Sequence, residues 1–595
     1  KRTNTILQSA FFKLADVMPI EDAVNFMKQA AQKSYGKKGQ DVVEMNWKAI
    51  DAGVDAIHKV DVPASWSNPA ADPAPKALAG RPELVKQIRD VMEPIARMDG
   101  DSLPVSAFVA NANGEWEQGA SAYEKRGTAV NVPEWDAAKC VGCNQCAFVC
   151  SHATIRPFQL TADELAAAPA QTKSRDNRPA NEYKFVMAVS PLDCMGCGEC
   201  VTVCPTKAIT MVPQDSQADQ QAVFDYCVAN ISKKPSKFAD DTVIGSQFNQ
   251  PLLEFSGSCA GCAETSYARL ITQLFGEKMY ISNATGCSSI WGGTASISPY
   301  TVNKDSGHGP AWCNSLFEDN AEHGLGMQIG YETVRANLIT KVEALKGKNA
   351  DLDAVIDKYL ETKNNTKAND APAKALIAAL EACGCDEAKE ILKDKQYLAK
   401  KSFWIFGGDG WAYDIGYGGL DHVLASGEDV NVMVFDTEMY SNTGGQASKA
   451  SNIGEVCQFA AAGKEISKKS LSEIAMTYGY IYVAQIALGA NMNQAVKAIA
   501  EAEAYPGPSL IIGYAPCELH GVKGGMTNCQ NEMKKAVEAG YWNLFTFNPA
   551  NKAQGKNPFT LTSKAVDNDK YQALLANETR YSRLTRAFPC LLYTS

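Results

Sequence analysis

Two runs of cysteines share one spacing, C-x2-C-x2-C-x3-C. They comprise Cys140, Cys143, Cys146 and Cys150, and then Cys194, Cys197, Cys200 and Cys204. This spacing is typical of domains that hold two [4Fe-4S] clusters, in which the fourth cysteine of each run binds the other cluster. A zinc site would use two separated cysteine pairs instead. The predicted ligand sets are therefore Cys140, Cys143, Cys146 and Cys204 for one cluster, and Cys194, Cys197, Cys200 and Cys150 for the other.

The segment from Trp404 to Gln446 predicts a second site. It reads as a strand, a tight Gly-Asp-Gly turn, a helix, a second strand and a polar loop. This order places Asp409 and the 436–443 loop together at the carboxyl edge of a parallel sheet, where ligands bind in open α/β folds. A carboxylate with nearby hydroxyl and carbonyl oxygens suits Mg²⁺, which typically bridges a protein to a diphosphate. We therefore expect a magnesium diphosphate group at Asp409.

The distance from this turn to the polar loop strengthens the prediction, because Gly-Asp-Gly alone is a common turn. About 30 residues separate Asp409 from Asn442, with a helix and a strand between them. This spacing matches the cofactor motif of thiamine diphosphate enzymes. The second half of that motif usually carries Asn-Asn, whereas this loop runs from Thr437 to Asn442 without that pair.

Length, charge and cysteine content narrow the class of protein. With 595 residues, the chain should form three or four folded units. Its net charge of −10 argues against binding to nucleic acid or to an anionic membrane. No stretch approaches the ~18 consecutive apolar residues of a membrane helix, so we expect a cytoplasmic protein. Nineteen cysteines in so long a chain favour metal ligation over disulfides.

The sequence pattern predicts a multidomain fold that combines α/β and α+β domains. Residues 1–58 read as the helical tail of an upstream domain, and residues 59–127 as a small connecting domain. Residues 128–216 form a two-[4Fe-4S] ferredoxin-like domain. Residues 217–595 alternate short β-rich runs with helices, which predicts a parallel-sheet α/β domain with a helical insertion near 340–400. The first residue is not Met, and we expect the chain to be part of a longer one.

Several longer motifs carry a family resemblance. GDGWAYDIGYGGLDHV and SNTGGQ, with CAGCAETSYARL and NATGCSSIWGG upstream and YAPC downstream, resemble segments of pyruvate:ferredoxin (flavodoxin) oxidoreductases. YEKRG and VPEW, ahead of the cysteine runs, extend the likeness over essentially the whole chain. The chain resembles the C-terminal part of the single-chain form, and so a partial enzyme without the N-terminal domains.

This resemblance implies a site for thiamine diphosphate and Mg²⁺ and a third [4Fe-4S] cluster. Asp409, the Thr437 side chain and the Met439 carbonyl would hold the metal. Cofactor contacts are implied for Glu264, Cys287, Gly408, Asp409, Gly410, Trp411, Thr437, Glu438, Met439, Tyr440, Ser441 and Asn442. Asn442 is also assigned a catalytic role. The third cluster is implied on Cys259, Cys262, Cys287 and Cys517.

The resemblance also implies a reaction. Pyruvate would be decarboxylated oxidatively with coenzyme A to acetyl-CoA and CO₂, and electrons would pass through three clusters to ferredoxin or flavodoxin. We expect a homodimer, and we expect this chain alone to be inactive because half of the thiamine site is missing. Three alternatives stay open: another 2-oxoacid as the substrate, a polyferredoxin that only relays electrons, or fusion to a flavin reductase domain with NADP as the acceptor.

Overall fold

The computed structural model describes residues 3–67, 77–235, 237–294, 297–347, 349–564 and 566–588. The chain divides into two compact units, residues 1–78 and 79–595, which are described separately. The first unit contains the helices α1 (Thr3–Ala15), α2 (Ile20–Tyr35) and α3 (Gln40–Asp55). Helix α3 packs on the other two and buries Val43 and Ile50 between them. The helical pattern expected for this part of the chain agrees with these elements.

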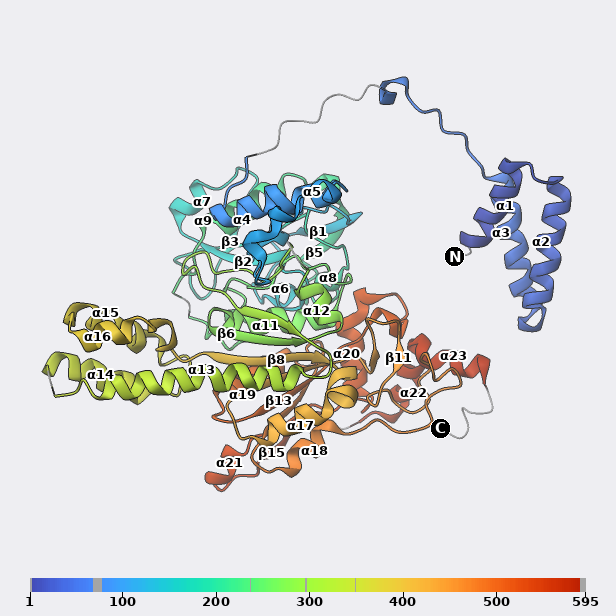
Figure 1. The fold of residues 1–595 in the computed structure, drawn as a ribbon. Helices are drawn as coiled ribbons and strands as arrows, with labels where there is room; N and C mark the ends of the chain where they lie inside the picture. Colours follow the sequence, from blue (N-terminus) through green and yellow to red (C-terminus); the bar gives the residue numbers. More distant parts are fainter. Residues whose placement is uncertain are drawn as a thin grey trace. The chain divides into compact units, whose positions relative to one another are not determined.

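An eight-stranded sheet forms the centre of the second unit (Figure 1), in the order β15-β14-β12-β13-β9-β8-β6-β7. Its strands are β6 (Met279–Ala284), β7 (Ala311–Ser315), β8 (Ser402–Gly408), β9 (Asn431–Asp436), β12 (Tyr482–Ile486), β13 (Ser509–Tyr514), β14 (Phe545–Phe547) and β15 (Phe559–Leu561). The strands from β12 to β7 in this order are parallel, and β14 and β15 add antiparallel pairs at one end. Every residue of β9 is buried, as expected of a parallel sheet covered on both faces. The predicted parallel sheet is confirmed.

Helices cover both faces of this sheet. Helix α13 (Asn320–Glu343) packs on β6 and β8 and against α17 (Tyr417–Ala425). Helix α19 (Met492–Ala504) packs on β12 and β13 and contacts α11 (Ala263–Phe275). Right-handed crossovers place α13, α17 and α18 (Leu471–Thr477) on one face and α19 on the other. The carboxyl ends of the strands are left free for loops.

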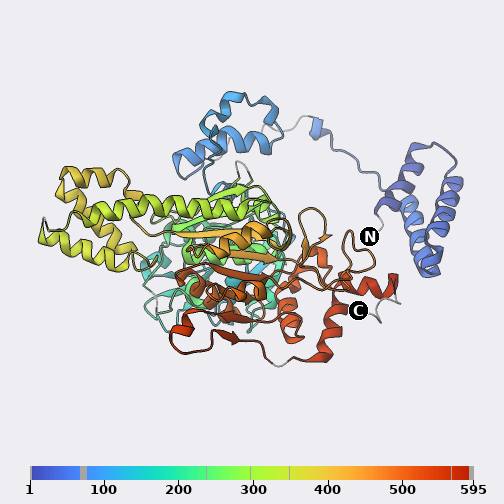
Figure 2. The same cartoon turned by 60° about the horizontal axis from the view of Figure 1, so that its bottom comes forward.

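Helices α14 (Ala350–Thr362), α15 (Asp370–Cys383) and α16 (Asp386–Leu392) lie between β7 and β8 in sequence. They share a small apolar core with the end of α13, which includes Leu352 and Leu376. Figures 1 and 2 both show these helices beyond the end of α13, away from the strands. Their own core explains how they can project from the sheet.

The two cysteine runs lie in a small domain with two antiparallel sheets. One sheet pairs β1 with β5, and the other has the order β2-β4-β3. The elements of this domain are β1 (Asn131–Trp135), α6 (Gln145–Val149), β2 (Ile155–Leu160), α7 (Ala162–Ala166), β3 (Arg175–Asp176), β4 (Lys184–Val189), α8 (Glu199–Thr202), β5 (Ile209–Pro213) and α9 (Gln220–Asn230). The residues before α6 and α8, Asn144 and Gly198, both have a left-handed backbone, with φ of 58° and 82°. The repeat that the cysteine spacing predicts is therefore visible in the backbone.

Short elements complete the second unit. They are α4 (Pro82–Gln87), α5 (Glu93–Ala96), α10 (Val243–Ser246), α12 (Cys287–Gly292), β10 (Met439–Tyr440), β11 (Gln446–Ala447), α20 (Cys529–Glu538), α21 (Ala550–Ala553), α22 (Asn568–Asn577) and α23 (Thr579–Ala587). In the described part of the chain, no helix has the length and apolar character that crossing a membrane requires.

Candidate functional site

The two cysteine runs interleave in space. Helix α6 of the first run packs against α8 of the second. Burial raises the pKa of the Cys146 and Cys200 thiols well above the usual value. The nearby thiols that raise it further are Cys143, Cys140 and Cys204 for Cys146, and Cys197, Cys150, Cys146 and Cys194 for Cys200. Each fourth cysteine thus lies among the first three of the other run. This is the arrangement in which each run contributes one ligand to the other cluster.

Backbone amides point at two of these sulfurs. Gly142 N–H donates to Cys140 Sγ at 3.3 Å, and Gly196 N–H donates to Cys194 Sγ at 3.4 Å. Both glycines have a left-handed backbone, with φ of 72° and 69°, which glycine adopts without strain. Hydrogen bonds to the sulfurs help to set the potential of a cluster. The local backbone therefore suits thiolate ligands.

The cysteine groups as placed do not form single-ion sites. Among the described residues, no group of three or more His, Cys, Asp or Glu side chains is gathered tightly enough to bind one metal ion. A structural zinc site needs four ligands at about 2.0–2.3 Å from one ion. Four cysteine thiolates are the usual ligand set of a four-iron cluster.

Four loops meet at the carboxyl edge of the parallel sheet. Cys287 follows β6, Asp409 follows β8, Thr437 follows β9, and Cys517 lies shortly after β13. These strands are neighbours in the order β13-β9-β8-β6, so the loops that follow them share one edge. The placement predicted for Asp409 and the 436–443 loop agrees with this arrangement.

The loop after β9 wraps around the Asp409 carboxylate. Thr437 donates to Asp409 Oδ1 from its backbone N–H at 3.2 Å and from its hydroxyl at 2.9 Å, and this hydroxyl lies 3.0 Å from the Met439 carbonyl oxygen. The Ser448 hydroxyl donates to Oδ2 at 2.5 Å. Burial and the charge of Asp436 raise the pKa of Asp409, and a bound cation would oppose that shift. Carboxylate, hydroxyl and carbonyl oxygens so close together suit Mg²⁺.

The Gly-Asp-Gly turn is packed tightly on one side and open on the other. A Cβ on Gly410 would lie 2.5 Å from the Tyr440 ring, and one on Gly407 would lie 2.3 Å from the Trp411 ring. A Cβ on Gly408 would have its nearest neighbour 3.9 Å away. Packing therefore requires glycine at positions 407 and 410, whereas Gly408 has open space beside it.

The third set of cysteines gathers around Glu264. This residue is buried, accepts a hydrogen bond from Trp291 Nε1 at 3.0 Å, and has its pKa raised to about 7 by burial. After burial, the groups that raise the pKa of the Cys287 thiol are Glu264, Cys262, Cys517 and Cys259. The fold therefore brings together four cysteines that are more than two hundred residues apart at the extremes.

The other predicted cofactor residues differ in their surroundings. The Ser441 hydroxyl lies 2.6 Å from the Thr437 hydroxyl, and so it belongs to the group of oxygens near Asp409. Asn442 is exposed on the same loop, and its catalytic role stays a prediction.

Sequence reasoning missed the buried charges that hold this loop. Glu438 has a φ of 61°, which is uncommon for a residue other than glycine. Its carboxylate pairs with Lys468 at 2.9 Å and with Arg580 at 2.8 Å. Arg580, which is 1% exposed, also pairs with Glu455 at 3.1 Å and with Glu578 at 2.6 Å. Apart from Glu578, the partners of Arg580 are more than a hundred residues away in sequence, so no spacing pattern signals them.

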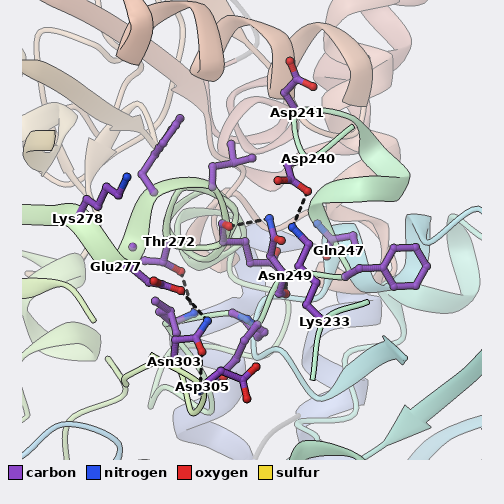
Figure 3. A pocket seen from close by; sticks show the side chains of 18 of the residues that line it. Lys233, Asp240, Asp241, Gln247, Asn249, Thr272, Glu277, Lys278, Asn303 and Asp305 are labelled. Atoms are coloured by element: carbon purple, nitrogen blue, oxygen red, sulfur yellow. Dashed lines mark hydrogen bonds and ion pairs between the residues drawn. The ribbon is translucent and has the colours of Figure 1, made fainter. Parts of the chain in front are cut away.

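A separate cavity of about 610 Å³ lies at the opposite edge of the sheet. Its lining includes Lys278, directly before β6, and the end of α19. Figure 3 shows polar side chains that partner one another there: Lys233 donates to Asp240 at 2.7 Å, and Asn303 donates to Glu277 at 2.6 Å. Among the described residues, no predicted cluster or cofactor residue lines this cavity. It is therefore distinct from the site at the carboxyl edge.

Three parts of the chain match family models. Residues 139–208 match a 4Fe-4S dicluster domain, and residues 392–512 match the C-terminal TPP binding domain of thiamine pyrophosphate enzymes. Residues 71–129 match a domain of unknown function. The predicted two-cluster domain and the predicted thiamine diphosphate domain are confirmed.

Relatives match almost the whole chain. The pyruvate-flavodoxin oxidoreductase of Klebsiella pneumoniae is 50% identical over 598 residues, which cover 99% of this chain and 50% of the relative. The pyruvate:ferredoxin oxidoreductase of Moorella thermoacetica is 48% identical over 602 residues, with the same two coverages. Almost the whole chain is therefore similar to pyruvate:ferredoxin (flavodoxin) oxidoreductases. The chain spans about half the length of these oxidoreductases. The pyruvate dehydrogenase [NADP(+)] of Euglena gracilis is 43% identical to it, and the chain spans 33% of that protein's length.

The dicluster domain lies next to the third cysteine set. His152, two residues after Cys150, is buried, and its Nε2 lies 3.1 Å from the Ser258 carbonyl oxygen. Ser258 directly precedes Cys259. The cysteine group that includes Cys150 is thus adjacent to the third set.

Proposed function

We propose that this chain supplies the thiamine diphosphate and electron-transfer part of an enzyme that oxidises pyruvate. With coenzyme A, the whole enzyme would form acetyl-CoA and CO₂ and reduce ferredoxin or flavodoxin. One observation carries the proposal: the oxygens around Asp409 and the third cysteine set occupy the same sheet edge, next to a dicluster domain. A protein that only relays electrons has no use for the oxygens around Asp409.

The residues at the sheet edge have separable roles in this proposal. When bound, thiamine diphosphate provides an electron sink for decarboxylation. Asp409, Thr437 and the Met439 carbonyl would hold Mg²⁺ against the diphosphate. Trp291 would fix the orientation of the Glu264 carboxyl group beside the cofactor. Burial of these groups keeps water away from the charges and strengthens their interactions.

The cysteine sets would form a relay of three [4Fe-4S] clusters. Cys259, Cys262, Cys287 and Cys517 would hold the cluster next to the cofactor. The cluster of the Cys150 group would follow, because His152 connects its loop to the segment before Cys259. The cluster of the Cys204 group would come last and face the external acceptor. Such clusters span roughly −700 to +450 mV, which includes the low potentials that this transfer requires.

The partners and location proposed here follow the names of the relatives. The relatives from Klebsiella pneumoniae and Moorella thermoacetica are named for a flavodoxin and a ferredoxin acceptor. We infer that the whole protein uses one of these carriers, works as a cytoplasmic homodimer, and binds neither nucleic acid nor membranes.

Substrate tests of the anaerobic holoenzyme examine the proposal. With pyruvate and coenzyme A, the enzyme should reduce flavodoxin or ferredoxin, and omission of either substrate should stop net turnover. The same assay with 2-oxoglutarate should give little reduction. Faster turnover of 2-oxoglutarate, or reduction that ignores pyruvate, would be incompatible with this function.

Replacement of Cys517 tests the third cluster. In the holoenzyme, Cys517→Ser should lower the iron content from about twelve to about eight or eleven per chain, because a cluster is lost or converted to a three-iron form. The dicluster signals and the affinity for magnesium thiamine diphosphate should persist. The control is Cys313→Ser, since the Cys313 thiol donates to the Ile281 carbonyl at 3.6 Å within the sheet. Wild-type iron content in the Cys517 variant would exclude this residue as a ligand.

A further inference from the structure

His520 connects two loops at the carboxyl edge of the sheet. It ends the turn Glu518–His520, which follows Cys517, and its side chain is fully buried. The Cys517 backbone N–H donates to His520 Nδ1 at 3.4 Å. On the other side of the ring, His520 Nε2 lies 2.8 Å from the Thr437 carbonyl oxygen.

These two contacts define the state of the ring. A nitrogen that accepts a hydrogen bond carries no proton, so Nδ1 is the acceptor in a neutral imidazole. The proton must then be on Nε2, which donates to the Thr437 carbonyl. Both nitrogens are occupied, one by each loop, and no second arrangement of the proton satisfies both contacts.

The two loops that His520 joins carry proposed ligands of two different sites, the third cluster and the magnesium diphosphate site. Cys517 belongs to the third cysteine set, and Thr437 belongs to the oxygens around Asp409. Strands β9 and β13 pair directly before these loops, with Asp436 opposite Tyr514. The pairing of β9 with β13 therefore ends at Asp436 and Tyr514, and the His520 side chain links the two loops that follow.

We propose that His520 is a positioning residue that fixes the third cluster and the magnesium diphosphate site relative to each other. This inference rests on the proposed function. Its Nε2 side holds the Thr437 carbonyl, and thereby the direction of the Thr437 and Met439 oxygens. Its Nδ1 side holds the Cys517 backbone, and thereby the sulfur that binds iron. A fixed separation matters because a small displacement in a reacting site can cost a large factor in rate.

Three variants of the holoenzyme separate the two sides of the ring. His520→Leu removes both hydrogen bonds. His520→Gln has an amide nitrogen near the position of Nε2, so it can keep the bond to Thr437. His520→Asn has an amide oxygen near the position of Nδ1, so it can keep the bond from the Cys517 N–H. Asn431→Leu is the matched control, because Asn431 is buried at the amino end of β9 and both ends of its amide are paired, with Phe403 and Ser509.

The measurements are the Kd of magnesium thiamine diphosphate and the EPR spectrum of the third cluster. We expect His520→Leu to raise the Kd by about tenfold or more, the usual effect of losing a partner just outside a metal site, and to alter the spectrum. His520→Asn should raise the Kd with little spectral change, and His520→Gln should do the reverse. Asn431→Leu should leave the Kd within about twofold of the wild-type value.

The outcomes distinguish this inference from the proposed function. If the wild-type holoenzyme binds no thiamine diphosphate, the proposed function itself fails. If the wild type binds it and His520→Leu gives the same Kd and spectrum, the positioning role is wrong. Equal losses in His520→Leu and Asn431→Leu would also overturn it, because they would indicate a general packing defect. Should the leucine variant lose its iron during purification, opposite changes in the Gln and Asn variants still decide the question.

Discussion

Asp409→Ala should abolish the retention of magnesium thiamine diphosphate by the holoenzyme while all three cluster signals remain. The carboxylate is the charged member of the oxygen group that includes Thr437 and Met439. Loss of a residue that hydrogen-bonds a metal ligand typically lowers metal affinity about 10–100-fold. Loss of a direct, charged ligand should therefore lower it by about a hundredfold or more. Equilibrium dialysis with Mg²⁺ and thiamine diphosphate measures the change.

A matched control for this variant is Asp421→Ala, because Asp421 lies on α17 and accepts a hydrogen bond from the Tyr478 hydroxyl at 2.8 Å. The cofactor affinity of Asp421→Ala should equal that of the wild type. Tight cofactor binding by Asp409→Ala would remove Asp409 from the magnesium site.

Without cofactor, Asp409→Asn should be at least as stable as the wild type above the normal pKa of aspartate. Burial and Asp436 raise the pKa of Asp409, so the ionised carboxylate destabilises the folded state in that pH range.

Arg580→Ala should destabilise the C-terminal part of the chain by about 3–5 kcal/mol, the usual cost of removing one partner from a buried ion pair. Three buried carboxylates, those of Glu438, Glu455 and Glu578, would lose a cation. Lys468 still pairs with Glu438. Its single ammonium group cannot replace the planar guanidinium, whose several N–H groups pair with more than one carboxylate. Urea unfolding, followed by amide hydrogen exchange around Glu438, measures the effect.

The Arg580 variant should also weaken cofactor binding. Glu438 lies between Thr437 and Met439 in sequence and has a left-handed backbone, which must be held by its contacts. Arg583→Ala is the control, since Arg583 is on the same helix but exposed. If the two variants unfold at the same urea concentration, the buried network does not stabilise this loop.

Local patterns in the sequence were sufficient to predict the sheet and the two-cluster domain. The β-rich runs correspond to β6, β8, β9, β12 and β13, and the GDG turn lies at the carboxyl edge because parallel strands end there. Strands β7, β14 and β15 have only three to five residues and carry no clear alternation. Their pairing depends on neighbours that are distant in sequence.

The contacts around the site could not be predicted in the same way. The prediction for Cys517 rests only on the family resemblance, since an isolated cysteine after a strand has no spacing signal. His520 reaches Thr437 over 83 residues, and Arg580 reaches Glu455 over 125 residues. Such contacts are created by the fold and leave no period or motif in the sequence. The residues that hold the loops therefore became visible only in the structure.

Metal analysis of the anaerobically purified holoenzyme tests the central claim most directly. The measurement is iron, acid-labile sulfide, zinc and thiamine diphosphate in one sample. Three [4Fe-4S] clusters and one cofactor predict about twelve irons, about twelve sulfides and about one thiamine diphosphate per chain, with little zinc. Stoichiometric zinc without sulfide, or a full set of irons without any thiamine diphosphate, would contradict the proposed combination of a cofactor site with a three-cluster relay.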